Sequence, residues 1–317
     1  MSIDTTEKRF EQDIETFLLS PEGGYTVLDM ETYDKKRAIN MHYLISFIKS
    51  TQPKAWKCYE AIYNGNAELS LYRRFNECVT ADGLIFTLRR GIKDRGVTFS
   101  LVYFAPTSAL NPELTEFYNK NILTCTRQFH YSTENNNSID MVLSLNGIPI
   151  VALELKNQLK GQTVENSKLQ FMHDRNPKEN CFGFNKRFLV YFAVDLYEAY
   201  MTTKLDNSKT YFLPFNQGSN GAGEVGGAGN PASATGYVTS YLWEKVLQRD
   251  MLMRILQRYI SLQIEEKTEI KNGTKTKRKT KKIIFPRYHQ LDVVEKILAD
   301  VTNHGSGKNY QIGRAHV

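Results

Sequence analysis

Residues 138–156 read SIDMVLSLNGIPIVALELK, and this stretch decides the fold of the chain. Two apolar, strand-like runs, 138–145 and 148–155, are separated by Asn146-Gly147. An Asn-Gly pair between such runs is a strong signal for a tight β-hairpin. We therefore predict two adjacent antiparallel strands.

Three charged residues lie in this apolar hairpin: Asp140, Glu154 and Lys156. Strand side chains alternate with period two, so Glu154 and Lys156 project from the same face. A strict two-residue loop would place Asp140 opposite Leu153 and put Glu154 on the other face. We predict a three-residue connection or a bulge that pairs Asp140 with Glu154, which fits Pro149, a residue without an amide donor.

Two carboxylates and an amine around one point are typical of metal-dependent phosphodiester cleavage. Carboxylates hold hard cations such as Mg²⁺, and an ammonium group stabilises charge on a scissile phosphate or orients the attacking water. In the competing interpretation the three residues are unrelated, solvated charges, because acids and lysines are common. A hydrophobic strand that ends in two charges on one face favours a site.

Motifs on both sides of the hairpin carry a family resemblance. They are NPELT (111–115), LTCTRQFHYS (123–132), SID (138–140), ALELKN (152–157), TTKL (202–205), FLPFN (212–216) and FPRYHQ (285–290). In this order they resemble the amino-terminal nuclease domain of type I restriction enzyme R subunits (HsdR). The last motif is similar to the entry to that family's helicase motor.

The resemblance implies an α/β fold with a restriction-endonuclease-like PD-(D/E)xK core. Its central mixed sheet is flanked by helices, and a helical segment then leads to a helicase domain that is missing here. Asp140 and Glu154 would be Mg²⁺ ligands together with the Leu155 backbone carbonyl, and Lys156 would be the catalytic lysine. The implied activity is that of a type I site-specific deoxyribonuclease, coupled in the full protein to ATP-driven translocation.

Two further site residues follow from the resemblance. Such families often add a helical Gln-x-x-x-Tyr motif, and a helix is expected from Thr163 to about Asp174. Gln170 takes the glutamine position, but Asp174 stands where a tyrosine is expected. On a first helix over 6–19, Glu11 is the candidate acid for holding a metal-bound water. In the bland interpretation Gln170 and Glu11 only face solvent.

Charge favours a polyanionic partner such as double-stranded DNA. The net charge is +7 and the sequence pI is about 9.0. Much of the excess lies in residues 271–282, where Lys275, Lys277, Arg278 and Lys279 are candidate phosphate contacts. A solvated linker or hairpin tip is the alternative interpretation, and both can hold.

The carboxy-terminal end resembles the approach to an ATP site. Gln290 would contact adenine in the full motor, but no GxxxxGK[ST] loop follows, so ATP is expected only in the full-length subunit. Residues 312–317 can be encoded by ATC GGA AGA GCA CAC GTC, which resembles a sequencing adapter. We therefore expect a non-native tail there.

Four domain segments are predicted along the chain. They are a nuclease domain over 1–265 with a Gly-rich insertion near 216–236, a basic linker or hairpin over 266–284, the start of a helicase motor over 285–311, and the adapter-derived tail over 312–317. The isolated fragment should bind DNA weakly and cleave poorly.

The composition of the chain also bears on where it acts and with which partners. No apolar run reaches 18 residues, the start is not a signal peptide, and four scattered cysteines form no CxxC pair. A cytoplasmic protein without a membrane partner is expected, acting with modification (M) and specificity (S) subunits. The alternatives are another PD-(D/E)xK nuclease of DNA repair or mobile elements, or a non-catalytic DNA-binding module.

Local patterns predict the remaining elements. Helices are expected over 34–50, 111–120 and 239–263, with a helical or irregular stretch over 53–63, and strands over 84–88, 97–104, 123–132, 187–194 and 197–204.

Overall fold

The computed structural model describes the chain except residues 1–6, 109, 158–160, 234–235, 272–273 and 311–317. For residues 267–271 and 274–278 it describes the backbone only. The predicted adapter-derived tail therefore lies outside the described residues.

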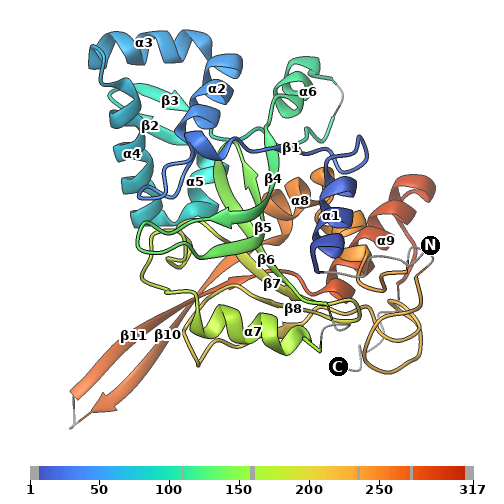
Figure 1. The fold of residues 1–317 in the computed structure, drawn as a ribbon. Helices are drawn as coiled ribbons and strands as arrows, with labels where there is room; N and C mark the ends of the chain where they lie inside the picture. The colour runs from blue at the N-terminus through green and yellow to red at the C-terminus, as the bar shows by residue number, and fades with distance from the viewer. Residues whose placement is uncertain (1–6, 109, 158–160, 234–235, 272–273, 311–317) are drawn as a thin grey trace.

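A seven-stranded mixed sheet forms the centre of the molecule (Figure 1). Across the sheet the strands are β1 (Thr26–Val27), β4 (Leu123–His130), β5 (Ser138–Leu145), β6 (Ile148–Leu155), β7 (Val190–Val194), β8 (Ala199–Thr202) and β9 (Leu213–Pro214). The β1–β4 and β6–β7 pairs are parallel, and the others are antiparallel. This is the α/β architecture that the sequence predicted.

Helices surround the sheet. They are α1 (Glu7–Leu18), α2 (Met41–Thr51), α3 (Pro53–Tyr63), α4 (Ala67–Asp82), α5 (Leu84–Arg90), α6 (Pro112–Asn119), α7 (Val164–His173), α8 (Arg249–Arg254) and α9 (Tyr288–His304). A short 3-10 helix (Met30–Thr32) and two π-helical segments, η3 (Leu242–Val246) and η4 (Ile255–Tyr259), complete the helical elements that the structure describes.

Two antiparallel ribbons stand apart from the central sheet. The small ribbon joins β2 (Ile92–Asp94) to β3 (Val97–Phe99). The large one joins β10 (Ser261–Lys271) to β11 (Thr274–Ile284) and projects away from the body of the molecule (Figure 1). The basic segment of the sequence is therefore a strand of a hairpin.

The two faces of the sheet pack against different hydrophobic clusters. Leu153 and its neighbour Phe192 on β7 belong to the larger cluster, which includes residues of α1, α2, α4 and α5. Ala152 and Tyr191 belong to the smaller cluster, together with Phe171 of α7. Because side chains alternate along a strand, the position of Glu154 belongs to the face that α7 covers.

Several predicted elements are confirmed, because their signals are local. Helices α1, α6 and α7 and strands β4 to β8 lie where the patterns indicated. Asn111 and Thr163 cap α6 and α7 through their side chains, as predicted. Most of the Gly-rich stretch near 216–236 is a loop closed by backbone bonds, such as that from Gly218 N–H to the Gly229 carbonyl.

Four expectations were wrong, and the first is the strand expected over 97–104, which ends at Phe99. Residues 84–88 form part of helix α5 and not a strand. A short, mostly apolar run fits a buried helix and a buried strand equally well, so periodicity does not separate them. The helix expected over 34–50 begins only at Met41, where the Asn40 side chain caps it. The helix expected over 239–263 breaks at Gln248, whose backbone is extended (ψ 142°) and whose side chain caps α8; it ends at Tyr259, before β10.

Candidate active site

The β5–β6 hairpin brings the two acids together. Leu145 pairs with Ile148 across a two-residue turn, but the register shifts by one residue between Leu143 and Ser144. This is the predicted bulge, not the three-residue connection. Met141 then pairs with Leu153, and one step further along the same register sets Asp140 opposite Glu154.

The turn of this hairpin is buried and tied to distant segments. Asn146 and Gly147 have φ values of 50° and 80°, which the tight hairpin turn requires. The Asn146 amide donates to the Leu101 carbonyl at 2.9 Å and accepts from the Ile122 N–H at 2.7 Å. The Gly147 carbonyl accepts from the Asn40 N–H at 2.8 Å. The site is therefore anchored at its far end by the fold.

Asp140 and Lys156 lie in contact. Asp140 Oδ2 accepts the Leu155 backbone N–H at 2.7 Å, which fixes the orientation of the carboxylate. Lys156 Nζ lies 3.6 Å from Asp140 Oδ2 and donates to the Leu155 carbonyl at 3.1 Å. Both side chains are buried. A carbonyl oxygen has two lone pairs, so the Leu155 oxygen keeps one for another ligand.

Glu154 is fully buried and bound by Arg175. Both Nε and Nη2 of Arg175 donate to the single oxygen Oε1, at 2.8 and 2.6 Å. Burial and then the neighbouring Asp140 raise the pKa of Glu154 well above its usual range, and Arg175 opposes this rise. Burial lowers the pKa of Arg175, but Glu154 and Tyr131 outweigh it and the net shift is upward. The guanidinium is therefore charged.

The second carboxylate oxygen of Glu154, Oε2, is a candidate ligand for a cation. Oε2 is buried and has no hydrogen-bond partner among the described residues. A buried carboxylate oxygen without a donor is costly, and a bound cation would satisfy it. No group of three or more Asp, Glu, His or Cys side chains suited to a metal occurs in the described part of the chain. Two carboxylates plus the Leu155 carbonyl match the oxygen ligands of Mg²⁺.

Glu11 is buried, contrary to the solvated alternative. It is 3% exposed and accepts a hydrogen bond from Gln128 Nε2 at 3.1 Å, with Arg127 Nε at 3.6 Å. Gln170 is partly buried on α7, and its Oε1 has no hydrogen-bond partner within the described residues. Within the described residues no hydrogen bond joins Gln170 to Asp140 or Glu154, so its role stays a prediction.

The predicted DNA and nucleotide contacts lie far along the chain from this site. Lys279 on β11 is exposed and pairs with Glu266 at 2.8 Å. Lys275, Lys277 and Arg278 belong to β11 by their backbone, but their side chains lie outside the described residues. Gln290 is exposed, and its Oε1 accepts from the Arg287 N–H at the start of α9.

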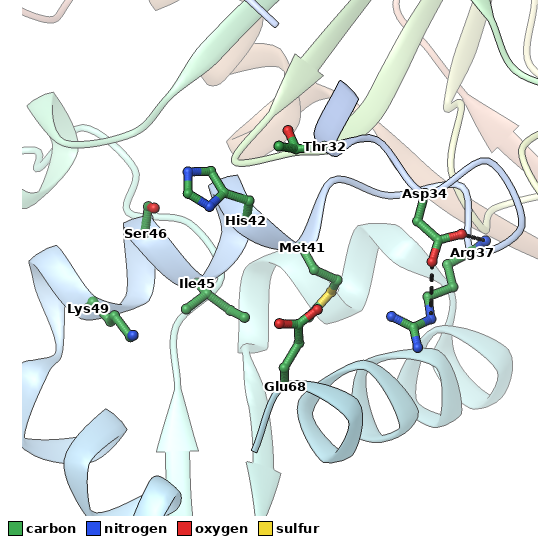
Figure 2. A pocket seen from close by; sticks show the side chains of 9 residues that line it. All are labelled: Thr32, Asp34, Arg37, Met41, His42, Ile45, Ser46, Lys49 and Glu68. Atoms are coloured by element: carbon green, nitrogen blue, oxygen red, sulfur yellow. Dashed lines mark hydrogen bonds and ion pairs between the residues drawn. The ribbon is translucent and has the colours of Figure 1, made fainter. Parts of the chain in front are cut away.

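A separate hollow of about 420 Å³ lies over α2 (Figure 2). Its lining includes His42 and Lys49 of α2 and Glu68 of α4. Asp34 and Arg37, also in the lining, are bonded to each other. None of the predicted site residues lines this hollow, so its size does not identify the active site.

Comparison with protein families decides the identity of this region. A family model described as type I restriction enzyme R protein N terminus matches residues 4–210, more than half of the chain. The chain belongs to this family. A comparison with curated proteins found no match.

Membership identifies the matched region as the amino-terminal nuclease region of a type I restriction enzyme R subunit. Asp140, Glu154 and Lys156 all lie inside the matched range. This favours restriction over the repair and mobile-element alternatives. No helix in the described part of this R-subunit region is long and apolar enough to cross a membrane.

Sequence reasoning missed Arg175. It follows the C-cap of α7, 21 positions after Glu154, where no periodic or spaced pattern marks it. The only available signal was the need of a fully buried glutamate for a charged partner.

Proposed function

We propose that this R-subunit region hydrolyses phosphodiester bonds of double-stranded DNA with Mg²⁺, at the centre formed by Asp140, Glu154 and Lys156. The observation that carries the proposal is the bulged register that sets Asp140 opposite Glu154 on one face, with Lys156 Nζ 3.6 Å from Asp140.

Each residue has a role that fits its contacts. Asp140, Glu154 Oε2 and the Leu155 carbonyl would hold the ion, since all are oxygen ligands on adjacent strands. When bound, the ion acts as a Lewis acid and would lower the pKa of an attacking water. Lys156, held by the Leu155 carbonyl, is placed to stabilise negative charge on the phosphate. Arg175 fixes Glu154 so that Oε2 is the oxygen left for the ion.

The large ribbon would add DNA affinity without sequence preference. Lys281 and Lys282 are exposed beside Lys279, and such cations bind phosphates by releasing counterions. Lys279 and Lys282 have glutamate partners, but surface pairs are weak and do not prevent phosphate contact. Sequence recognition would belong to the M and S subunits, and ATP-driven translocation to the motor of the full-length subunit, where Gln290 would contact adenine.

The test is plasmid cleavage by the full R subunit assembled with its M and S subunits, with Mg²⁺ and ATP. Asp140→Asn and Lys156→Met should each lower cleavage about 100-fold or more, because each removes a group that acts on the reacting phosphate or the ion. Electron paramagnetic resonance measures Mn²⁺ binding to this chain, and this binding should be lost in Asp140→Asn.

Glu116→Gln is the matched control, since Glu116 is an exposed acid on α6 paired with Lys120. It should cleave like the wild type. Wild-type cleavage by both Asp140→Asn and Lys156→Met would show that the acids are structural and that the assignment is wrong.

A further inference from the structure

Gln128 has a strained backbone next to the proposed site. Its φ is 49°, in the left-handed region, which costs a non-glycine residue about 1–2 kcal/mol. On either side of it β4 pairs regularly with β5, Arg127 with Met141 and Phe129 with Ile139. Gln128 therefore lies across from Asp140. Such strain is retained at functional sites when the surroundings enforce it.

Both ends of the Gln128 amide are used. Nε2 donates to Glu11 Oε1 at 3.1 Å, and Oε1 accepts from Ser138 Oγ at 2.8 Å. Gln128 is exposed and Glu11 also pairs with Arg127, so these bonds add little net stability and do not explain the strain. The strained backbone instead directs the amide, which links Glu11 on α1 to Ser138 on β5, the strand that carries Asp140.

The links continue around Asp140 to Glu154. The Ser138 carbonyl accepts from Arg175 Nη2 at 2.7 Å, and the same nitrogen donates to Glu154 Oε1 at 2.6 Å. A continuous chain of hydrogen bonds thus runs from Glu11 through Gln128, Ser138 and Arg175 to Glu154.

We infer that Gln128 is a positioning residue that holds the Glu11 carboxylate beside Asp140, where it accepts a hydrogen bond from the attacking water. This inference rests on the proposed nuclease function and adds Gln128 to its machinery. Glu11 then acts on the water and not as a main ligand of the ion.

The test separates function from stability. Gln128→Gly removes the amide and also relieves the left-handed φ, so its melting temperature should be equal to or above that of the wild type. Cleavage at saturating Mg²⁺ should fall about 10- to 100-fold, as for other residues that orient a metal site. Gln128→Asn, which tolerates the same φ but is too short to bridge, should behave alike.

A double-mutant cycle tests the route through Glu11. If Gln128 acts by placing Glu11, then Glu11→Gln combined with Gln128→Gly should cleave no more slowly than Glu11→Gln alone. Mn²⁺ affinity of Gln128→Gly should equal that of the wild type. Arg95→Gly is the control, because it relieves a φ of 44° in the exposed β2–β3 turn and should leave cleavage unchanged.

Three results would overturn the inference: wild-type cleavage by Gln128→Gly, additive effects in the cycle, or loss of Mn²⁺ affinity as large as in Asp140→Asn. If these occur while Asp140→Asn is inactive, only the role of Gln128 fails. If the wild-type complex neither cleaves nor binds Mn²⁺, the proposed function fails with it.

Discussion

Arg175 shows how one side chain makes the buried site possible. Glu154 has no solvent exposure, and an isolated carboxylate in such a place is very costly. The guanidinium gives two hydrogen bonds to one oxygen, a third to Ser138, and lies against the Tyr131 ring. The side chain thus supplies charge and also sets which carboxylate oxygen remains for a ligand.

Arg175→Met should destabilise the protein by about 3–5 kcal/mol, because it leaves a buried carboxylate without its charged partner. Arg175→Lys should lose less stability, since it keeps the charge but not the two-donor geometry. Urea unfolding followed by circular dichroism measures the free energy of unfolding.

The control for Arg175 is Lys204→Met, which breaks an exposed pair with Asp206. Its free energy of unfolding should change by less than about 0.5 kcal/mol. An Arg175→Met protein as stable as the wild type would mean that Glu154 is neutral in the folded state.

The Asn146-Gly147 turn connects hairpin geometry to the rest of the fold. A Cβ on Gly147 would lie 2.1 Å from the Asn40 carbonyl oxygen, at a φ of 80°. The turn of the small ribbon has the same kind of backbone, with Gly96 at a φ of 85°, but nothing lies within 4 Å of a Cβ there. Comparing Gly147 with Gly96 therefore separates the effect of backbone conformation from the effect of packing.

Gly96→Ala should cost about 1–2 kcal/mol, the penalty for a left-handed alanine. Gly147→Ala should cost clearly more, because the added methyl group also displaces the backbone at Asn40. Thermal or urea unfolding of both variants checks the difference. Equal losses would show that the backbone at Asn40 moves away freely.

The β10–β11 ribbon is the second element with a predicted role. Lys279→Glu combined with Lys281→Glu should weaken DNA binding and reduce the slope of log affinity against log salt by up to about 2, since each lost phosphate contact removes about 0.9. Fluorescence anisotropy at several salt concentrations measures both.

The charge-matched control is Lys54→Glu with Lys57→Glu on α3, which lies far from the ribbon in Figure 1. It should change the salt slope less than the ribbon variant. Equal effects of the two double variants would mean that net charge alone, and not the ribbon, governs DNA binding.

Residues after the ribbon return to the core of the molecule. Phe285 packs against Phe192 of β7 and Phe215, with ring centroids 5.8 and 6.2 Å apart. Tyr288 of α9 packs edge-on against Tyr241 at 4.8 Å. The domain division at residue 285 stays a prediction, but these contacts couple α9 to the sheet.

Phe285→Ala should therefore lower the free energy of unfolding by about 3–5 kcal/mol while the protein still unfolds in one transition. Leu298→Ala, on the partly exposed side of α9, should lower it by much less. Separate unfolding transitions for α9 and the sheet would contradict this coupling.

Prediction from sequence succeeded where the signal was local. The hairpin, the caps of α6 and α7, and the pairing of Asp140 with Glu154 depend on residues close in the chain, and a bulge follows from the period of a strand. It failed at α5, because a short, mostly apolar run fits a buried helix and a buried strand equally well.

The sequence by itself determined the α/β class, the central hairpin and the single face shared by Asp140, Glu154 and Lys156, because backbone turn preferences and strand alternation are local properties. Only the tertiary structure decided that Arg175 binds Glu154, that Gln128 links Glu11 to Ser138, and that the Asn146-Gly147 turn is buried. The contacts of Glu11 and of the Asn146-Gly147 turn join residues far apart in the chain, and no local pattern marks Arg175. Burial, which makes the contacts of Glu154 and of the turn costly to break, exists only after the chain has folded.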